Sequence, residues 1–344
     1  MKHAYKALVI LIGGTILVNS VAAIAANSTP FNLTTSPVTV DLAGSPGTTV
    51  STTISVRNNN PVPAHLVMSV QKFSAYGEQG KALIGGGTAS DDYLKWVSFS
   101  PQQFDAAPNE WKDVIVTIAM PKTAAFGYYY AVEVSRAGDT AAVPGKQVFA
   151  GSNVVFMLLE AKVPSAVKRL DIVSIQATHN IYEYLPAEFN INVRNSGNIH
   201  AFPVGNVVIY RGKNQIDTLD VNKAHGNILP KTNRTFTASW KSGFPVYQPK
   251  MNGDSQVLDK AGKPVSVLKW DFSQLTKFRI GRYTASVVMA YNDGNGHDFP
   301  LTANVSFWVI PWRIIGLFLL IFVFTPIGFY VTVHRFLLRI KKRR

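Results

Sequence analysis

Hydrophobic and polar residues alternate along most of this chain in short segments separated by Gly, Pro, Asn and Ser. A period of two places apolar side chains on one face of a β-strand, and no amphipathic helical stretch of useful length interrupts residues 28–305. The predicted strands are 38–42, 48–57, 64–73, 94–99, 112–120, 128–136 and 153–161 in a first set, and 170–177, 187–194, 204–210, 232–240, 283–291 and 301–307 in a second. About seven strands per hundred or so residues predict an all-β fold of two tandem Ig-like antiparallel β-sandwiches.

An internal repeat supports two copies of one module. Residues 54–60 (Ile-Ser-Val-Arg-Asn-Asn-Asn) return as 191–197 (Ile-Asn-Val-Arg-Asn-Ser-Gly), so a strand ends at Arg-Asn and enters a polar turn in both copies. Later, residues 126–132 are echoed by 280–286, where a glycine turn leads to a strand that begins with tyrosine.

The repeat predicts one domain at residues 27–163 and a second at 164–308, joined by the Val-Pro-Ser segment 163–165. The second copy is longer because of an insertion at 241–269, which is rich in Gly, Pro, Lys and Asp. Each domain is large enough to bury its own core.

The two tyrosine-led strands disagree in register. In the second copy, alternation places Tyr283 on the apolar face, whereas in the first copy Val132 and Val134 place Tyr128 and Tyr130 there. A shift of one residue turns a whole strand over. Either a β-bulge intervenes, or the tyrosines of the two copies are not equivalent.

The C-terminal region predicts a membrane span. Residues 314–333 carry no formal charge and are mostly Ile, Leu, Val and Phe, and twenty helical residues cover the roughly 30 Å hydrocarbon layer. Trp308 and Trp312 lie at one edge and basic residues at the other. Because basic residues favour the cytoplasmic side, we expect a single-pass transmembrane helix at 309–334, a cytoplasmic tail at 335–344 and an extracellular ectodomain in the cell membrane.

The first 26 residues have the pattern of a signal peptide. Lys2 and Lys6 precede an apolar run at 7–18, and small residues follow, which predicts cleavage after Ala25 or Ala26. An uncleaved signal anchor is the alternative, because the apolar stretch can be counted to nearly twenty residues.

Charge and cysteine content narrow the function classes. The net charge of +14 is concentrated in the signal and around the span, and the ectodomain retains 25 basic and 20 acidic residues without a basic cluster interleaved with aromatics. This small excess of basic over acidic residues does not indicate a nucleic-acid-binding surface. The absence of cysteine excludes thiol catalysis and thiolate metal sites, and it favours a bacterial surface protein over a disulfide-rich eukaryotic ectodomain.

No pattern of catalytic or metal-binding residues stands out. The seven histidines lack metal-pair spacing, and no carboxylate pair, Gly-rich phosphate loop or Gly-x-Ser-x-Gly elbow occurs, so we expect no enzyme activity, metal or cofactor. The Asp-Gly-Asn-Gly-His-Asp segment 293–298 predicts a hairpin turn rather than a calcium loop. The Leu-Pro-Lys-Thr-Asn segment 229–233 lies too far from the span for a sorting signal and predicts a loop that enters a strand.

Four segments resemble the WxL-interacting proteins of Gram-positive bacteria. They are the extended strand with Arg-Asn at 50–58, the polar turn at 73–77, the strand at 114–121 and the Gly-Tyr-Tyr-Tyr segment at 127–130. The signal peptide, two modules, one span and basic tail complete the resemblance. It implies a first module associated with peptidoglycan, a second associated with host or partner surfaces such as WxL-type proteins, and no catalytic residues.

The sequence therefore predicts a non-enzymatic cell-surface binding or scaffold protein, whose strand edges and loops contact cell-wall polymer or surface proteins. Aromatic side chains are effective anchors for sugars and proteins, and the candidate contacts are Tyr76, Tyr93, Trp96, Trp111, Tyr128, Tyr129 and Tyr130. The alternatives are an accessory subunit of a membrane complex, in which the helix makes the key contact, and a cell-wall-modifying enzyme.

The alternation in the tyrosine-led strand generates a first prediction. Val132→Asp is expected to lower the thermal midpoint far more than Glu133→Ala, because an unpaired carboxylate on the inward face loses its hydration. If Glu133 points to water, its loss costs about half a kcal/mol or less. Greater damage from Glu133→Ala would instead place Tyr129, Ala131 and Glu133 inward.

Overall fold

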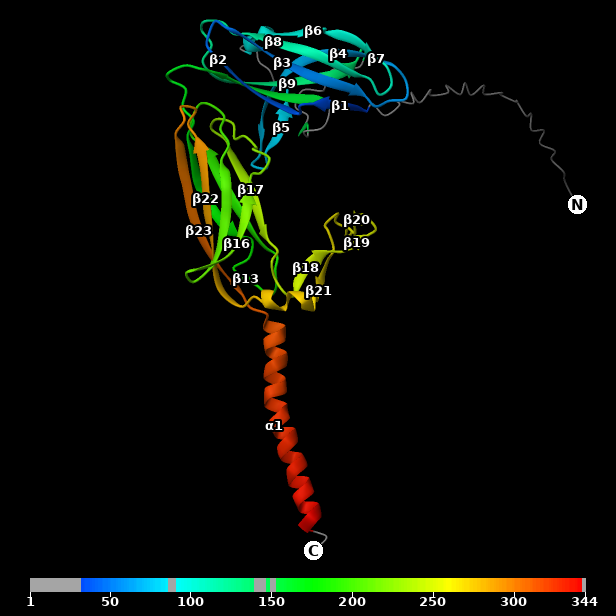
Figure 1. The fold of residues 1–344 in the computed structure, drawn as a ribbon, viewed down its shortest axis with the longest axis vertical. Coiled ribbons are helices and arrows are strands. Elements are labelled where there is room, and N and C mark those ends of the chain that lie inside the picture. The colour runs from blue at the N-terminus through cyan, green and yellow to red at the C-terminus, as the bar shows by residue number, and fades with distance from the viewer. Residues whose placement is uncertain (1–31, 86–90, 139–146, 149–152, 342–344) are drawn as a thin grey trace, which may run out of the picture.

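The computed structural model describes residues 32–85, 91–138, 147–148 and 153–341, which form mostly β-sheet followed by one long helix (Figure 1). The predicted signal peptide and the last three residues of the predicted tail lie outside this part of the chain. The first group of strands lies across the end of the second group that is farthest from the helix.

Two sheets pack face to face in the first sandwich. Its strands are β1 (Leu33–Ser36), β2 (Thr39–Gly44), β3 (Thr49–Asn58), β4 (Ala64–Tyr76), β5 (Lys81–Ile84), β6 (Val97–Ser100), β7 (Gln103–Ala106), β8 (Trp111–Ala119), β9 (Phe126–Arg136), β10 (Gln147–Val148) and β11 (Val154–Ala161). The four-stranded sheet has the order β1-β3-β8-β6, and the seven-stranded sheet has the order β10-β5-β4-β9-β11-β2 with β7 paired to β4. Their inner faces share one core that includes Ile54, Val116 and Val132.

The second sandwich is built in the same way. Its strands are β12 (Leu170–Ala177), β13 (Ile181–Tyr182), β14 (Ala187–Asn195), β15 (Val204–Arg211), β16 (Asn214–Val221), β17 (Asn233–Trp240), β22 (Gly281–Asn292) and β23 (Asp298–Val309). A three-stranded sheet, β12-β14-β17, faces a five-stranded sheet, β13-β23-β22-β15-β16, across a core that contains Trp240, Tyr283 and Phe307. The domain limits at 163 and 164 stay a prediction, while β11 ends at Ala161 and β12 begins at Leu170.

The insertion forms small sheets of its own. It contains β18 (Val246–Pro249), β19 (Met251–Asn252), β20 (Ser255–Gln256) and β21 (Ser266–Lys269), and a 3₁₀ helix η2 (Phe272–Lys277) follows. Strands β18 and β21 pair with each other, as do β19 and β20. The hairpin projects sideways from the second sandwich at the level where the long helix begins (Figure 1).

The predicted strands are found, with two corrections. The predicted strand 94–99 is wrong in its first half, because the 3₁₀ helix η1 (Asp92–Trp96) occupies it and β6 starts only at Val97. The sheets are also not purely antiparallel, since β2 runs parallel to β11 and β13 runs parallel to β23. Strand direction depends on the partner strand, which periodicity within one segment does not specify. The sequence also missed strands of two to four residues, which are too short to show a period, and the polar strand β16.

The register conflict between the copies is resolved without a bulge. The ladders of β9 with β11 and of β22 with β23 are continuous. Tyr283 is buried in the core of the second sandwich, whereas Tyr130 takes that place in the first and Tyr129 lies on the opposite face of β9. The tyrosines of the two copies are therefore not equivalent.

The outer face of the seven-stranded sheet is also covered by protein. Phe73, Ile84, Ala131, Phe156 and Leu158 form a second cluster there. Glu133 on this face is consequently half-buried rather than fully hydrated, and the side-chain amide of Gln71 donates to its carboxylate at 3.1 Å. The expected cost of Glu133→Ala therefore rises to about 1 kcal/mol, still well below that of Val132→Asp.

Each of the two repeated Arg-Asn segments contains one buried asparagine side chain, and the two side chains make equivalent hydrogen bonds. The Asn58 side chain is fully buried, donates to the carbonyls of Val62 and Ala106, both at 2.9 Å, and accepts the Asn60 N–H at 3.0 Å. Asn195 has the same partners by position in the second sandwich: it donates to Ile199 and Ile228, both at 2.8 Å, and accepts the Gly197 N–H at 2.9 Å. Each amide thereby holds a turn against a neighbouring loop.

The helix α1 (Trp312–Lys341) begins shortly after β23. Its segment Trp312–Arg335 is long and apolar enough to cross a membrane, and it starts three residues later and ends one residue later than the predicted span at 309–334. Ile310 and Pro311 are the two residues between the strand and the helix. Proline is favoured where a helix starts, because the N–H that it lacks would have no partner within the helix there.

The buried amides generate a second prediction. Asn58→Ala and Asn195→Ala are each expected to lower the free energy of unfolding by about 3 kcal/mol, because two carbonyls and one N–H lose their partner. The exposed Asn214 serves as the matched control, and Asn214→Ala should change it by less than about 0.5 kcal/mol. Denaturant unfolding measures all three. Equal small effects would show that the amides do not hold the turns.

Candidate functional site

Four of the seven predicted aromatic contacts gather at one edge of the first core. Tyr93 and Trp96 come from η1, Tyr128 and Tyr130 come from β9, and the Tyr93 ring centroid lies 5.3 Å from both tyrosine rings. Trp96 packs edge-on against Tyr128 at 4.7 Å. Tyr130 is fully buried, and burial raises the pKa of the Tyr93 and Tyr130 hydroxyls. This cluster closes the core, and only parts of Tyr93, Trp96 and Tyr128 reach the surface.

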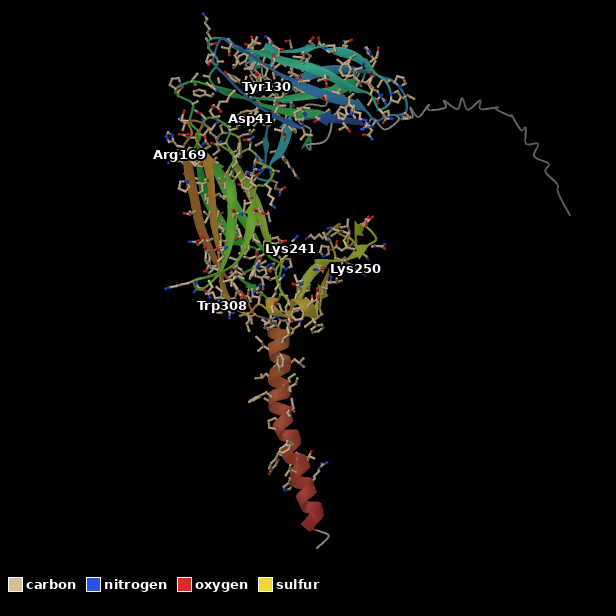
Figure 2. The ribbon with its side chains drawn as sticks, viewed as in Figure 1. Asp41, Tyr130, Arg169, Lys241, Lys250 and Trp308 are labelled. Atoms are coloured by element: carbon tan, nitrogen blue, oxygen red, sulfur yellow. The ribbon has the colours of Figure 1, made fainter. Side chains whose placement is uncertain are left out.

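Tyr129 lies at the junction of the two sandwiches. Its ring packs edge-on against His200 of the second sandwich at 5.7 Å, and burial raises the pKa of its hydroxyl. His200 Nε2 in turn lies 2.9 Å from the carboxylate of Asp41, which Figure 2 labels at this junction. Tyr129 therefore joins the two sandwiches rather than facing solvent.

Further polar contacts and a cavity mark the same junction. Lys168 Nζ lies 2.6 Å from Glu160, and the Glu78 carboxylate accepts from the Asn192 amide at 2.7 Å. A cavity of about 620 Å³ lies between the sandwiches, and its lining includes Phe73 of the first and Arg234 of the second. No sequence signal indicated this junction, because its partners are distant in the chain.

Tyr76 and Trp111 are the two predicted aromatics that are largely exposed, at 45% and 47%. Tyr76 ends β4 in the seven-stranded sheet, and Trp111 begins β8 in the four-stranded sheet. The structure therefore does not bring the seven residues into one site. Trp111 is the one that stands on an extended exposed sheet face.

That face, which we call the hydroxyl face, is the outer side of the four-stranded sheet. Because successive side chains of a strand point to opposite faces, Ile54, Val56 and Val114 point into the core, and the residues between them point outward. The outward residues are Thr34, Ser36, Thr49, Ser51, Thr53, Ser55, Arg57, Ser98, Ser100, Trp111, Asp113, Ile115 and Thr117. Hydroxyl groups thus occupy both outward positions on β1 and on β6, four of the five on β3, and the Thr117 position on β8.

Cross-strand hydrogen bonds order these side chains. The hydroxyls of Ser51 and Thr117 lie 3.1 Å apart, and Ser55 donates to the Asp113 carboxylate at 2.6 Å. Arg57 is the cross-strand neighbour of Trp111 and donates to Asn109 at 3.2 Å. Each hydroxyl can donate and accept, and the Trp111 ring offers an apolar surface, so the face suits a ligand rich in hydroxyl and amide groups.

The sequence contained a signal for this face that the strand prediction did not use. In the segment Thr49–Asn58, residues 49, 51, 53 and 55 are all Ser or Thr, while residues 54 and 56 are apolar. The strand prediction depends on the inward positions alone. The outward positions of one strand, however, do not show which strands lie beside it in the sheet.

The loop 293–298 is a hairpin turn, as predicted. It connects β22 and β23, whose ladder closes at Asn292 and Asp298. The Asp293 carboxylate accepts the N–H of Asn295 at 2.7 Å and that of His297 at 3.1 Å, which lowers its pKa to about 2. Its oxygens are thus used by the loop itself. Within the described residues, no group of three or more His, Asp or Glu side chains could hold a metal ion.

The segment 229–233 is a loop that enters a strand, as predicted. Lys231 adopts a positive φ of 59°, and β17 starts at Asn233. The side chain of Leu229 packs against the cluster on the outer face of the seven-stranded sheet. The loop therefore also belongs to the junction between the sandwiches.

Comparison with known proteins gives distant likenesses. No family model matches the sequence, and no curated protein matches it. Among solved structures, the class 5 fimbriae chaperone CfaA is 12% identical with a TM-score of 0.35, over 81% of this chain and 100% of that one. The E. coli chaperone DraB is 11% identical with a TM-score of 0.32, over 79% and 98%. The Pseudomonas aeruginosa CupB2 chaperone is 11% identical with a TM-score of 0.31, over 80% and 100%. At this distance, the likenesses assign neither a family nor a function to the chain.

Proposed function

We propose that this chain is a membrane-anchored, non-enzymatic surface protein whose first sandwich binds a cell-wall polymer through the hydroxyl face. The supporting observation is the uneven cover of its two sheets. The seven-stranded sheet is covered on its outer side by the cluster around Phe156, whereas the hydroxyl face carries exposed Ser and Thr side chains beside Trp111. Ordered hydroxyls next to a partly exposed indole ring match a glycan, which offers hydroxyls along its edges and apolar C–H faces.

Peptidoglycan is the polymer that we propose, with support from the resemblance to WxL-interacting proteins in the first module. The same resemblance gives the second sandwich a surface-protein partner of the WxL type. The hydroxyl face carries Arg57 and Asp113, one charge of each sign. We therefore expect hydrogen bonding and ring stacking to dominate and the affinity to change little with salt.

Binding to cell-wall sacculi tests this proposal. The full chain in detergent should co-sediment with purified sacculi, and Trp111→Ala should weaken binding by about fivefold or more, as expected for an aromatic anchor. Tyr76→Ala is the matched control, because Tyr76 is equally exposed on the other sheet, and it should leave binding unchanged. Equal binding by the wild type and both variants would contradict a role for the hydroxyl face.

The orientation across the membrane is open to an independent test. We propose that the sandwiches are extracellular and that the basic residues after position 334 are cytoplasmic, because basic residues are retained on the inside. Protease added to intact cells should remove Tyr129 and the rest of the ectodomain and leave a protected fragment that contains α1. Survival of the ectodomain until the cells are permeabilised would reverse the orientation.

A further inference from the structure

The second sandwich exposes an aromatic cluster beside the start of α1. Trp270 and Phe272 stack with ring centroids 6.3 Å apart, and Phe244 lies 5.8 Å from the first ring and 5.4 Å from the second. Phe272 is 70% exposed and Leu275, on the same 3₁₀ helix, is 58% exposed. Trp270 is 47% exposed, whereas Phe244 lies beneath the two rings and is only 5% exposed, so we call Trp270, Phe272 and Leu275 the apolar ledge. So much exposed apolar surface on one short segment marks a contact site.

Side-chain contacts connect the apolar ledge to the first turn of α1. Tyr184 packs edge-on against Trp270 at 6.5 Å, and the adjacent Glu183 lies 3.5 Å from the guanidinium of Arg313. Figures 1 and 2 show the insertion and Trp308 at this same end of the second sandwich, where α1 emerges. Trp308 and Trp312 are also about half exposed. The apolar ledge thus lies at the level where α1 leaves the second sandwich.

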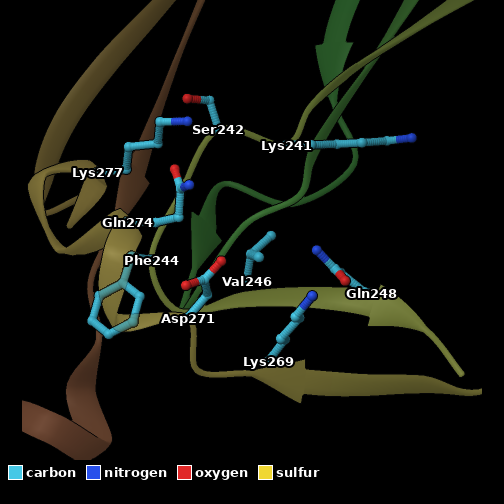
Figure 3. A pocket seen from close by; sticks show the side chains of 10 residues that line it. Lys241, Ser242, Phe244, Val246, Gln248, Lys269, Asp271, Gln274 and Lys277 are labelled. Atoms are coloured by element: carbon cyan, nitrogen blue, oxygen red, sulfur yellow. The ribbon is translucent and has the colours of Figure 1, made fainter.

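Three lysines are among the residues that line a small cavity beside the apolar ledge. The cavity has a volume of about 250 Å³, and its lining includes Lys241, Lys269, Lys277, Asp271 and Gln274 (Figure 3). The Asp271 carboxylate accepts from the hydroxyl and the N–H of Ser273, which lowers its pKa. Three lysines against one carboxylate leave the cavity positive and suited to a phosphate group.

We propose that the segment 241–278 is a second membrane contact, in which the apolar ledge enters the headgroup layer beside α1 and the lysine-lined cavity receives the phosphate of an anionic lipid. The proposal rests on α1 spanning the bilayer. Aromatic rings favour the interfacial zone, and surface elements that combine apolar and lysine side chains bind anionic membranes. Continuity with α1 favours lipid over a protein partner, because the contacts of Glu183 with Arg313 and of Tyr184 with Trp270 place the start of the apolar helix beside the ledge.

Contact of both α1 and the ledge with the membrane would fix the tilt of the second sandwich relative to the bilayer, whereas α1 alone would allow the sandwich to rotate. Strand β23 leads into α1 through two residues, and the carbonyl of Tyr182 in β13 accepts the Ile310 N–H at 2.8 Å. The insertion lies to one side of this connection. Membrane contact there would therefore also direct the first sandwich, at the far end, away from the bilayer.

Site-directed fluorescence tests the proposal, and the chain is well suited to it because it contains no cysteine. Phe272→Cys, Phe299→Cys and Phe324→Cys are labelled singly with an environment-sensitive dye in the full chain, which is placed in nanodiscs of phosphatidylcholine with phosphatidylglycerol. Phe299 is exposed at the far end of β23, and Phe324 lies in the middle of α1. Quenching by brominated lipid should reduce emission at 272 and 324 at least about twofold, and leave emission at 299 unchanged.

The outcomes separate this proposal from the membrane span. Quenching at 324 but not at 272 would overturn the interfacial contact and leave the span intact, and absence of quenching at both would overturn both.

The lysines are tested by the double variant Lys269→Gln/Lys277→Gln in anionic nanodiscs. Each lysine near such a surface contributes about fivefold to membrane affinity, so the ratio of membrane-bound to unbound ledge, measured by quenching at 272, should fall several-fold. Lys122→Gln/Lys223→Gln, remote from α1, is the matched control and should have no effect. Equal quenching in nanodiscs of phosphatidylcholine alone would overturn the role of the lysine cavity.

Discussion

Burial of both faces of the seven-stranded sheet decides how the first sandwich can be used. Its inner face packs on the four-stranded sheet, and its outer face carries the cluster of Phe73, Ile84 and Phe156, on which Leu229 of the second sandwich also packs. Apolar side chains on both sides make β11 buried almost throughout. The second sandwich therefore joins at this sheet, and the hydroxyl face of the other sheet stays open to solvent.

Polar side chains stabilise the turns within each sandwich and the junction between the two sandwiches. Asn58 and Asn195 satisfy buried backbone carbonyls and N–H groups in the two copies with the same geometry, and a buried polar group left without a partner is costly. At the junction, Asp41 and His200 connect one sandwich to the other, as do Glu160 and Lys168. These contacts relate the orientation of the hydroxyl face to that of the second sandwich.

The end of the second sandwich from which α1 emerges combines three features that have one physical interpretation. The apolar helix, two half-exposed tryptophans and the apolar ledge with its neighbouring lysine-lined cavity lie at this end. Each is costly in water alone and favourable at a bilayer, where apolar side chains leave water and ammonium groups meet lipid phosphates. In the proposed arrangement, the insertion that distinguishes the second copy from the first is a membrane-contacting element, and glycan binding is left to the first sandwich.

The sequence by itself determined the positions of most strands, the apolar helix and the hairpin at 293–298. It also determined that Tyr130 and Val132 point into the core. Each of these features depends on local periodicity or turn chemistry. Only the tertiary structure decided that Tyr129 lies in the junction, that Trp111 stands on an open face and that Trp270 and Phe272 meet beside α1. Alternation separates the two sides of a strand, but it does not specify which strand pairs with it or what covers its second side. Those depend on contacts between residues far apart in the chain, as the parallel pairing of β2 with β11 also shows.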